Sequence, residues 1–456
     1  FVLRKFSAAC ILFSLLLIFQ ICLPVFAEEV PDLSAEAFIL IDMESGQVLT
    51  EKNADQRRSP ASTTKILTAM IALERASLDT DMIASQTAIN SVDIYNYVTA
   101  GIKPGEIIKL KSLIELMMVT SANEVGYIIA ENVSPDGTIS GFVKLMNDKA
   151  AELGLTGSHF TNPCGVEDPD HYTTARDLAI LAREAMKYDA FREIVGKTEI
   201  TMPDTNFRKS GDWNASYLTY TNRLLTSRSK YYSKVTGIKT GYTDPAGRCL
   251  VASAVNPDGM ELISVVLGVD PQDQNLVFEE SQKLLEYGFA NYSIRDVVKD
   301  GEYVGRSDVA DAVDAKKVEL ITQGSIRHIL PVDSERLSQE LTQQKKLQEP
   351  FKAPIEKGQV LGSIEYFYKG KSIGSVNIIA NNAIEKTTIA QIRDKYMEIV
   401  NDERFILGLK IAGGLVVFLI ILRLVLRTIS RKNSRRRRYA SYSSSRRKNA
   451  RFRNFR

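Results

Sequence analysis

Residues 58–70 read RSPASTTKILTAM, and this stretch decides how the rest of the chain is interpreted. The pattern predicts an amphipathic helix that begins at Ser62. Its apolar face is formed by Ile66, Leu67, Met70, Ile71 and Leu73. Lys65 projects from the same face one turn after Ser62, near enough to take the hydroxyl proton if burial or a second cation keeps the amine uncharged. Ser62 and Lys65 are therefore a candidate S-x-x-K acylating pair, although the same letters also fit a helix-capping serine followed by a solvated lysine.

The S-x-x-K spacing occurs twice more, from Ser227 to Lys230 and from Ser445 to Lys448. Neither copy is followed by an apolar helical run, so we expect neither serine to be reactive. The three histidines of the chain have no metal-ligand spacing and suggest no Ser-His-Asp triad. We therefore expect a lysine to activate Ser62, with no metal ion and no cofactor.

The N-terminal end is typical of an exported protein. Residues 1–27 contain Arg4-Lys5 and an apolar run from Ala8 to Cys22. This layout predicts a secretory signal peptide that is cleaved after Ala27, with an uncleaved membrane anchor as the alternative.

A second apolar stretch, residues 405–426, is long enough to form a transmembrane helix. Residues 427–456 follow with 13 Lys or Arg and no acid. The positive-inside rule places this basic tail in the cytoplasm and residues 28–404 outside. Subtracting the charges of the tail (+13), the signal (+2) and the span (+2) from the net +3 of the chain leaves −14 for residues 28–404. An acidic exported part disfavours nucleic acid as a partner, and the position of the tail beside the span favours anionic lipid over nucleic acid.

The order of the hydrophobic patterns predicts an α/β (α+β) catalytic domain over residues 28–290. Two strands are expected within residues 37–50, and from Val235 to Gly268 the period changes to two, which predicts further strands. Strands from both ends of a domain most simply join in one antiparallel sheet with helices on its faces. The helices are expected at Ser112–Met118, Ala122–Ala130, Gly141–Leu153, Thr173–Lys187 and, as the closing element, Glu279–Phe289.

Short strands punctuated by glycines dominate residues 291–383, which predicts a small β-rich domain. Residues 384–404 are expected to form a juxtamembrane helix. Its apolar stripe consists of Ile389, Ile392, Tyr396, Ile399 and Val400.

Two short segments supply further candidate site residues. Ser121-Ala122-Asn123 gives an S-x-N pattern at the start of a predicted helix, and Lys239-Thr240-Gly241 gives K-T-G at the end of a predicted strand. Each pattern is common alone. Their occurrence in this order behind S-x-x-K, each on the expected type of element, has a small chance probability.

With these three motifs the chain resembles the D-alanyl-D-alanine carboxypeptidases, the low-molecular-mass penicillin-binding proteins of the serine peptidase and β-lactamase superfamily. Further segments extend the resemblance over roughly residues 33–290, and residues 292–380 look, less specifically, like the β domain of that family. The further segments are Ala37–Gly46, Asn162–Gly165, His171–Ala175 and Leu250–Ala254. The resemblance implies a β-lactamase/transpeptidase-like fold and a serine-type peptidase that removes the terminal D-alanine from peptidoglycan pentapeptides and is acylated by penicillin.

The resemblance also implies a role for each motif residue. Ser62 would form the acyl-enzyme, Lys65 would be its general base, and Ser121 would relay a proton to the leaving amine. Asn123 would bind the substrate amide. Lys239 would supply positive charge, Thr240 would bind the substrate carboxylate, and Gly241 would leave room for the peptide along the strand edge. The backbone N–H groups of Ser62 and Tyr242 would form the oxyanion hole.

Two features depart from the family pattern. Many relatives have an arginine shortly before the closing helix that helps to anchor the substrate carboxylate, whereas Gln274-Asn275-Leu276-Val277 offers none. We therefore expect the anchoring of the substrate carboxylate to depend more on Thr240. Relatives also often rest on the membrane through an amphipathic helix, whereas this chain is expected to cross it.

Several alternatives remain open from sequence. A class A β-lactamase would need an E-x-x-L-N-like loop between Asn123 and Lys239, and we find none there. A D,D-endopeptidase, a transpeptidase, or a slow-turnover penicillin-binding sensor or structural wall protein would share the same motifs. Cys164 and Cys249 remain after signal cleavage, and the sequence leaves open whether they pair.

Overall fold

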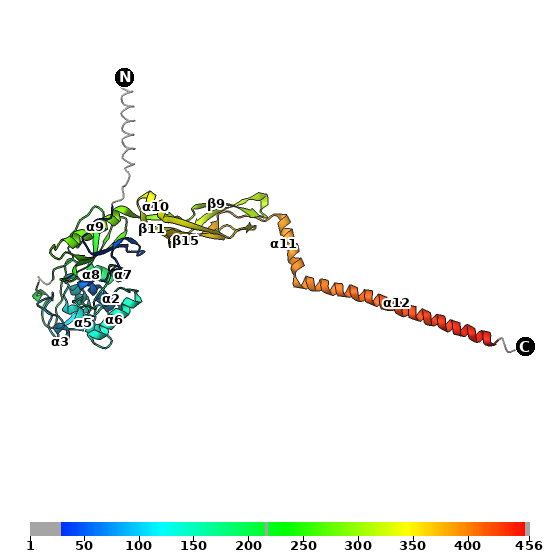
Figure 1. Ribbon diagram of the computed structural model, residues 1–456, viewed down its shortest axis with the longest axis horizontal. Helices are drawn as coiled ribbons and strands as arrows, with labels where there is room; N and C mark the ends of the chain where they lie inside the picture. Colours follow the sequence, from blue (N-terminus) through cyan, green and yellow to red (C-terminus); the bar gives the residue numbers. More distant parts are fainter. Residues whose placement is uncertain (1–28, 215–217, 452–456) are drawn as a thin grey trace, which may run out of the picture. The chain divides into compact units, whose positions relative to one another are not determined.

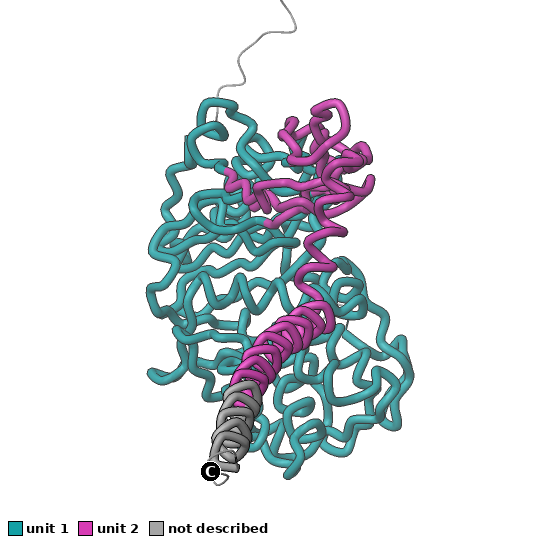
Figure 2. Tube along the Cα trace, turned by 90° about the vertical axis from the view of Figure 1, so that its right-hand side faces the viewer, with its two compact units in different colours: residues 1–297, 326–342, 366–373 teal, residues 298–325, 343–365, 374–456 magenta. Residues whose placement is uncertain are grey.

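The computed structural model describes residues 29–214 and 218–451, with side chains as far as Lys432. The predicted signal peptide, residues 1–27, lies outside the described residues. The chain divides into two compact units, which Figure 2 shows in different colours. Unit 1 consists of residues 1–297, 326–342 and 366–373, and unit 2 consists of residues 298–325, 343–365 and 374–456.

Unit 1 contains a five-stranded antiparallel sheet in the order β2-β1-β7-β6-β5. The strands are β1 (Ala37–Asp42), β2 (Val48–Lys52), β5 (Lys234–Thr243), β6 (Gly247–Val255) and β7 (Glu261–Val269). The N-terminal pair thus joins three strands from the far end of the unit through the pairing of β1 with β7. The predicted sheet and the mixed α/β class are confirmed.

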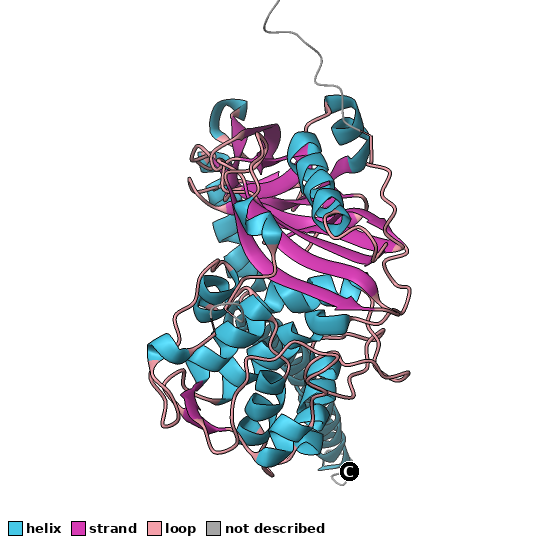
Figure 3. Ribbon diagram, turned by 90° about the vertical axis from the view of Figure 1, so that its left-hand side faces the viewer, coloured by secondary structure: helices cyan, strands magenta, loops and turns pink. Residues whose placement is uncertain are grey.

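The two faces of this sheet are covered by different helices, as Figure 3 shows. Because strand side chains alternate, Ile39 and Ile41 of β1 belong to the core beneath the helical block, whereas Phe38 and Leu40 belong to the core on the other face. The second core includes α9 (Leu276–Asn291), whose Ser281 hydroxyl lies 2.7 Å from the hydroxyl of Ser264 on β7. The sheet is therefore buried on both sides.

The helical block of unit 1 lies between β2 and β5 in the sequence. Its helices are α2 (Lys65–Arg75), α3 (Gln86–Asn90), α4 (Leu110–Glu115), α5 (Glu124–Val133), α6 (Ile139–Glu152), α7 (Ala175–Ala185) and α8 (Asp189–Val195). A two-stranded antiparallel sheet pairs β3 (Asp81–Ile83) with β4 (Ile107–Lys109). Side-chain caps explain where two helices begin, since Thr138 accepts the N–H of Gly141 and Thr174 accepts the N–H of Asp177. The predicted helices are found, with ends displaced by a few residues.

The residues that follow α9 form mainly strands, in agreement with the predicted β-rich region (Figure 1). Six strands form one sheet in the order β12-β14-β15-β10-β9-β13, and β11 pairs with β8. The strands are β8 (Tyr292–Val298), β9 (Tyr303–Ala310), β10 (Lys317–Gln323), β11 (Ile326–Pro331), β12 (Leu341–Leu347), β13 (Phe351–Lys352), β14 (Val360–Tyr368) and β15 (Lys371–Ala380). A short helix, α10 (Ser334–Glu340), interrupts this series.

Two helices end the chain. In α11 (Thr388–Asn401), Ala390 is buried and Arg393 pairs with Asp311, whereas the apolar stripe beginning at Ile389 is exposed. In α12 (Glu403–Arg451), residues Glu403–Lys432 are long and apolar enough to cross a membrane by length and composition, and none of that stretch is buried. The predicted membrane-spanning helix therefore has a counterpart in the structure.

Candidate active site

The side chains of Ser62 and Lys65 meet at the start of the first helix of the helical block. Ser62 lies in the short 3₁₀ helix η1 (Ala61–Thr64), which runs directly into α2. Lys65 is fully buried, and its Nζ lies 2.9 Å from Ser62 Oγ. The predicted serine–lysine pair is therefore in contact, and the alternative of a solvated lysine is wrong.

The S-x-N motif supplies the other partners of this amine. Lys65 Nζ lies 2.9 Å from the carbonyl oxygen of Ser121, 2.8 Å from Asn123 Oδ1 and 3.3 Å from Ser121 Oγ. Carbonyl oxygens only accept hydrogen bonds, so they take both N–H groups of an uncharged amine. The remaining lone pair of the nitrogen is then available to the hydroxyl groups of Ser62 and Ser121. The environment is thus suited to an amine that receives a proton from a hydroxyl.

Electrostatics favour the uncharged form of this lysine. Burial lowers the pKa of Lys65 to about 8, and the nearby Cys164 and Glu124 offset only part of that effect. Burial, together with the charge of Lys65, also lowers the pKa of Lys239 well below its usual value. Burial is the main cause at Lys65, and the second cation expected from sequence, Lys239, is not among the causes of the lowered pKa.

The backbone at the site adopts conformations that few residues choose. Ser121 follows a π-helical turn, η2 (Leu116–Thr120), and has φ +69 and ψ +22. Ala61, directly before Ser62, has φ +47. Left-handed backbone at non-glycine residues is costly and is concentrated at functional sites. At Ser121 this conformation directs both the carbonyl oxygen and the hydroxyl to Lys65.

The K-T-G motif lies on β5, beside Ser62. A Cβ atom on Gly241 would lie 3.0 Å from the carbonyl oxygen of Pro60 and 3.2 Å from the backbone nitrogen of Ser62. Any other residue would push the neighbouring backbone away by a few tenths of an ångström, so glycine suits the close approach of this strand edge to η1. Lys239 is buried, and its amine donates to the carbonyl oxygen of Thr240 at 3.1 Å. The three motifs, distant in sequence, meet around one place.

A turn behind Ser62 was not assigned a role from sequence. Gly165 has φ +79, and a Cβ on it would lie 1.7 Å from the carbonyl oxygen of Ala61. Asn162 Oδ1 accepts the N–H groups of Cys164, Gly165 and Val166 and so shapes this turn. His171 accepts the N–H of Thr161 at Nδ1, so its Nε2–H donates to Thr64 Oγ1 at 2.9 Å. Burial lowers the pKa of His171 to about 4, which keeps this imidazole neutral.

The motif residues open into a pocket of about 480 Å³. It is lined by Ser62, Asn96, Tyr97, Val98, Thr120, Ser121, Asn123, Gly165, Thr219, Tyr220, Thr221, Arg223, Thr240, Gly241, Tyr242, Thr243, Arg248, Cys249, Gln274, Val277 and Phe278. Ser62, Ser121, Asn123, Thr240, Gly241 and Tyr242 are thus found in one cavity, while Lys65 and Lys239 are buried beside it.

Two arginines are the charged members of this described lining. Arg223 donates from Nη1 to Asn275 Oδ1 at 2.9 Å, and Asn275 belongs to the segment in which many relatives have their anchoring arginine. Arg248 lies on β6 and pairs with Tyr242 on the neighbouring strand β5. Its guanidinium lies 5.0 Å from the centroid of the Tyr242 ring. Sequence reasoning looked only before the closing helix and missed both, because neither lies near the motifs in a recognisable spacing.

The comparisons with known proteins agree with this geometry. Residues 24–271 match the family model described as D-alanyl-D-alanine carboxypeptidase, of peptidase family S11. The chain belongs to the D-alanyl-D-alanine carboxypeptidase family. Residues 292–386 match the model described as the C-terminal domain of penicillin-binding protein 5.

Individual relatives cover most of the chain. It is 32% identical to D-alanyl-D-alanine carboxypeptidase DacF of Bacillus subtilis over 77% of this chain and 86% of the relative. The crystal structure of the D-alanyl-D-alanine carboxypeptidase DacD from Francisella tularensis superimposes with a TM-score of 0.60 and 26% identity, covering 80% of this chain and 97% of that chain. The Streptomyces K15 DD-transpeptidase superimposes with a TM-score of 0.51 and 28% identity, over 58% of this chain and all of the other.

The structure also bears on the two further S-x-x-K copies and on the two cysteines. The hydroxyl of Ser227 lies 2.7 Å from the hydroxyl of Tyr232, and the amine of Lys230 lies 4.7 Å from the ring centroid of Tyr231. The side chains of the copy at residues 445–448 lie outside the described part. Cys164 and Cys249 are both buried free thiols, so the disulfide left open from sequence is not formed.

Proposed function

We propose that the chain is a serine-type D-Ala-D-Ala carboxypeptidase that cleaves the terminal D-alanine from peptidoglycan pentapeptides through an acyl-enzyme at Ser62. The observation that carries this proposal is the contact of a buried, low-pKa amine with a pocket-lining hydroxyl, in which Lys65 Nζ lies 2.9 Å from Ser62 Oγ. Membership of the carboxypeptidase family supplies the substrate class.

Acylation begins with proton transfer from Ser62 Oγ to Lys65 Nζ while the oxygen attacks the carbonyl carbon of the penultimate D-alanine. The tetrahedral intermediate collapses when its C–N bond breaks. The leaving nitrogen receives the proton from Lys65 through the hydroxyl of Ser121, which lies 3.3 Å from that amine. D-Alanine leaves and an ester remains on Ser62. Water then attacks the ester, and Ser62 regains its proton.

The remaining motif residues bind and polarise the substrate. We assign the oxyanion hole to the backbone N–H groups of Ser62 and Tyr242, which the close approach of β5 to η1 at Gly241 supports. Asn123 would hydrogen-bond the substrate amide. Lys239, buried beside the pocket, would add positive charge there only when its amine is protonated.

The free carboxylate of the terminal D-alanine needs a donor set of its own. The hydroxyl of Thr240 lines the pocket and donates to that of Thr221 at 2.8 Å, and turning this donor to the substrate would bind the carboxylate. Because the pKa values of both site lysines are lowered, the permanent charges of Arg223 and Arg248 are the better counter-ions. We assign carboxylate binding to these two arginines together with Thr240.

For the whole chain we propose an exported enzyme anchored by a single span. The domains would be a signal peptide (1–27), a catalytic domain (28–290), a β-rich domain (291–383), a juxtamembrane helix (384–404), a transmembrane helix (405–426) and a basic cytoplasmic tail (427–456). Protease added outside intact cells should remove the catalytic domain and spare the tail. Loss of the tail instead would mean that the orientation is reversed.

The decisive experiment uses the full-length chain in detergent and a pentapeptide that ends in D-Ala-D-Ala. Prompt release of D-alanine, absent in Ser62→Ala, is expected of the carboxypeptidase. Transfer of the acyl group to an added amine would indicate the transpeptidase that one structural relative represents, and a stable acyl-enzyme without turnover would indicate a sensor. Mass spectrometry should locate a penicillin adduct at Ser62, and an adduct at Ser227 would contradict the assignment.

A further inference from the structure

One wall of the pocket is an irregular segment, residues 96–106, which we call the pocket loop. Asn96, Tyr97 and Val98 of this loop line the pocket. The carbonyl oxygen of Val98 accepts the backbone N–H of Asn123 at 2.9 Å and its side-chain Nδ2 at 3.0 Å. An asparagine amide has a donor end and an acceptor end, so binding Nδ2 to Val98 turns Oδ1 to Lys65, which it reaches at 2.8 Å. The pocket loop therefore sets the orientation of Asn123.

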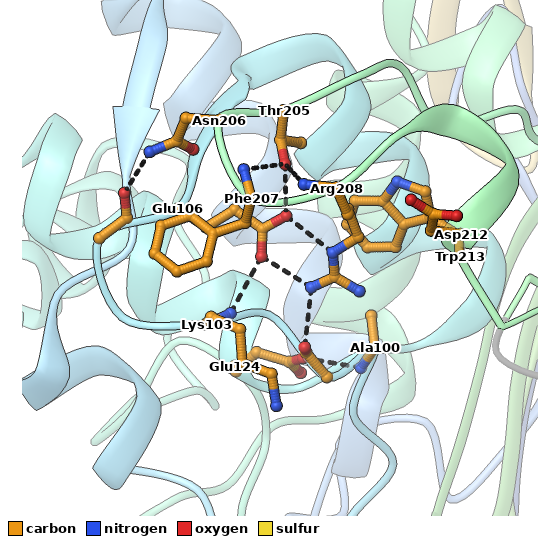
Figure 4. Close-up of polar contacts among 12 residues, drawn as sticks. Ala100, Lys103, Glu106, Glu124, Thr205, Asn206, Phe207, Arg208, Asp212 and Trp213 are labelled. Atoms are coloured by element: carbon orange, nitrogen blue, oxygen red, sulfur yellow. Dashed lines mark hydrogen bonds and ion pairs between the residues drawn. The ribbon is translucent and has the colours of Figure 1, made fainter.

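Side chains from two other segments hold this loop in place, as Figure 4 shows. At one end, the N–H of Ala100 donates to Glu124 Oε1 at 2.6 Å. A few residues later, Arg208 Nη2 donates to the carbonyl oxygen of Gly101 at 2.8 Å. Within the loop itself, the N–H of Lys103 donates to Glu106 Oε2 at 3.0 Å. A loop without regular hydrogen bonds of its own depends on such external partners for a single conformation.

Arg208 and Glu106 form the centre of this arrangement. Two parallel hydrogen bonds join them, from Nε to Oε1 at 2.9 Å and from Nη2 to Oε2 at 2.7 Å. Glu106 is fully buried, and its second donor on Oε1 is the hydroxyl of Thr205 at 2.9 Å. The guanidinium also lies 4.0 Å from the ring of Trp213. Burial opposes ionisation here, yet the hydrogen bonds from Arg208, Lys103 and Thr205 hold the pKa of Glu106 below its usual value.

We call Arg208, Glu106, Thr205 and Trp213 the clamp. None of these four residues lines the pocket. A buried ion pair adds little net stability compared with apolar packing, and its best-attested use is to fix one conformation. Here every acceptor of the Arg208 guanidinium lies within residues 101–106, which is the part of the pocket loop just beyond Val98.

We propose that Arg208 is a positioning residue for catalysis, which rests on the proposed function. Bound to Glu106 and Gly101, it fixes the pocket loop, so that Val98 holds Asn123 and Asn123 holds the amine of Lys65. Loss of the clamp frees the loop and admits water to Lys65. Burial is what lowers the pKa of Lys65, so entry of water should raise that pKa. The titratable groups that face this amine are Lys239, Cys164 and Glu124.

The test compares Arg208→Gln and Arg208→Lys with Lys209→Ala in the full-length chain in detergent. Lys209 is the matched control, because it pairs with Asp204 at 2.9 Å on the surface of the same segment. The rate constant of acylation by a fluorescent penicillin is measured from pH 6 to pH 10. We expect Arg208→Gln to lower the acylation rate constant about tenfold or more. The acidic limb of its pH profile should move to higher pH by half a unit or more. Arg208→Lys should fall between, and Lys209→Ala should match the wild type.

A merely structural role would lower the fraction of folded enzyme without moving the acidic limb. A folded Arg208→Gln enzyme with the wild-type limb overturns the proposal. If that variant does not fold, Arg208→Lys decides, because it keeps the charge and loses the paired hydrogen bonds; a wild-type limb there also overturns it. A wild-type chain that penicillin does not acylate would instead refute the proposed function, so the two failures are distinguishable.

Discussion

Two basic side chains of unit 1, the fully buried Lys65 and the largely buried Arg208, lie in clusters of opposite character. Lys65 is surrounded by carbonyl and hydroxyl oxygens, and among the described residues no carboxylate hydrogen-bonds to it. Arg208 shares two hydrogen bonds with the carboxylate of Glu106. Burial destabilises a charge in both clusters, but only in the second does a carboxylate hydrogen-bond to the basic group. The difference separates an amine poised to exchange a proton from a guanidinium fixed as a structural brace.

The largest effect should come from removing the amine of the first cluster. Lys65→Met keeps a similar volume without a base, so we expect the acylation rate to fall at least about a thousandfold, or roughly 4 kcal/mol. Thermal unfolding should change little, because relief from burying the amine offsets the hydrogen bonds that are lost. Stopped-flow acylation and calorimetry measure the two quantities. Substantial acylation by this variant would show that Lys65 is not the base.

The second cluster should respond in the opposite way. Glu106→Gln leaves Arg208 mostly buried without its counter-charge, and we expect a loss of about 3 kcal/mol in the free energy of unfolding. Chemical denaturation of the wild type and variant checks this. The surface pair of Lys144 and Asp148 is the control, since Lys144→Ala should change stability by less than about 0.5 kcal/mol. An equal effect of both changes would remove the distinction between the two clusters.

A third test concerns the cations that face the pocket. Arg223→Gln combined with Arg248→Gln should raise KM for a peptide with a free C-terminal carboxylate by about 10- to 100-fold, or roughly 1.4 to 2.7 kcal/mol. The matching C-terminal amide carries no negative charge, so its KM should not change. Arg228, which does not line the pocket, provides Arg228→Gln as the control. Equal losses for the acid and the amide would contradict a role in carboxylate binding.

The smallest effect is the pH dependence of the intact enzyme. Uncharged Lys65 is the active form, and burial lowers its pKa to about 8. The acylation rate should therefore rise with pH, about tenfold per unit below pH 8, and level off above it. Stopped-flow acylation by an uncharged substrate analogue from pH 6 to pH 10 measures this profile. A rate independent of pH in this range would mean that Lys65 is uncharged throughout.

Much of the fold and the motif residues could be predicted from the sequence. The apolar period behind Ser62 and the change to period two after Val235 give the helix and the strands, because local pattern and burial are directly linked. Gly165, His171 and Arg208 could not be predicted in their roles. Each acts through a partner far along the chain, such as Ala61, Thr64 or Glu106, and a single sequence does not record which distant residues touch.

The sequence by itself determined the kinds of chemistry available: a serine and a lysine one helical turn apart, two further motifs, and an apolar stretch long enough to span a membrane. Tertiary structure alone decided that Lys65 is buried among acceptors, that Gly241 touches η1 and that two arginines face the same pocket. The physical reason is that the reactivity of a side chain depends on its solvation and its neighbours, and these are set by packing between segments that are distant in the chain.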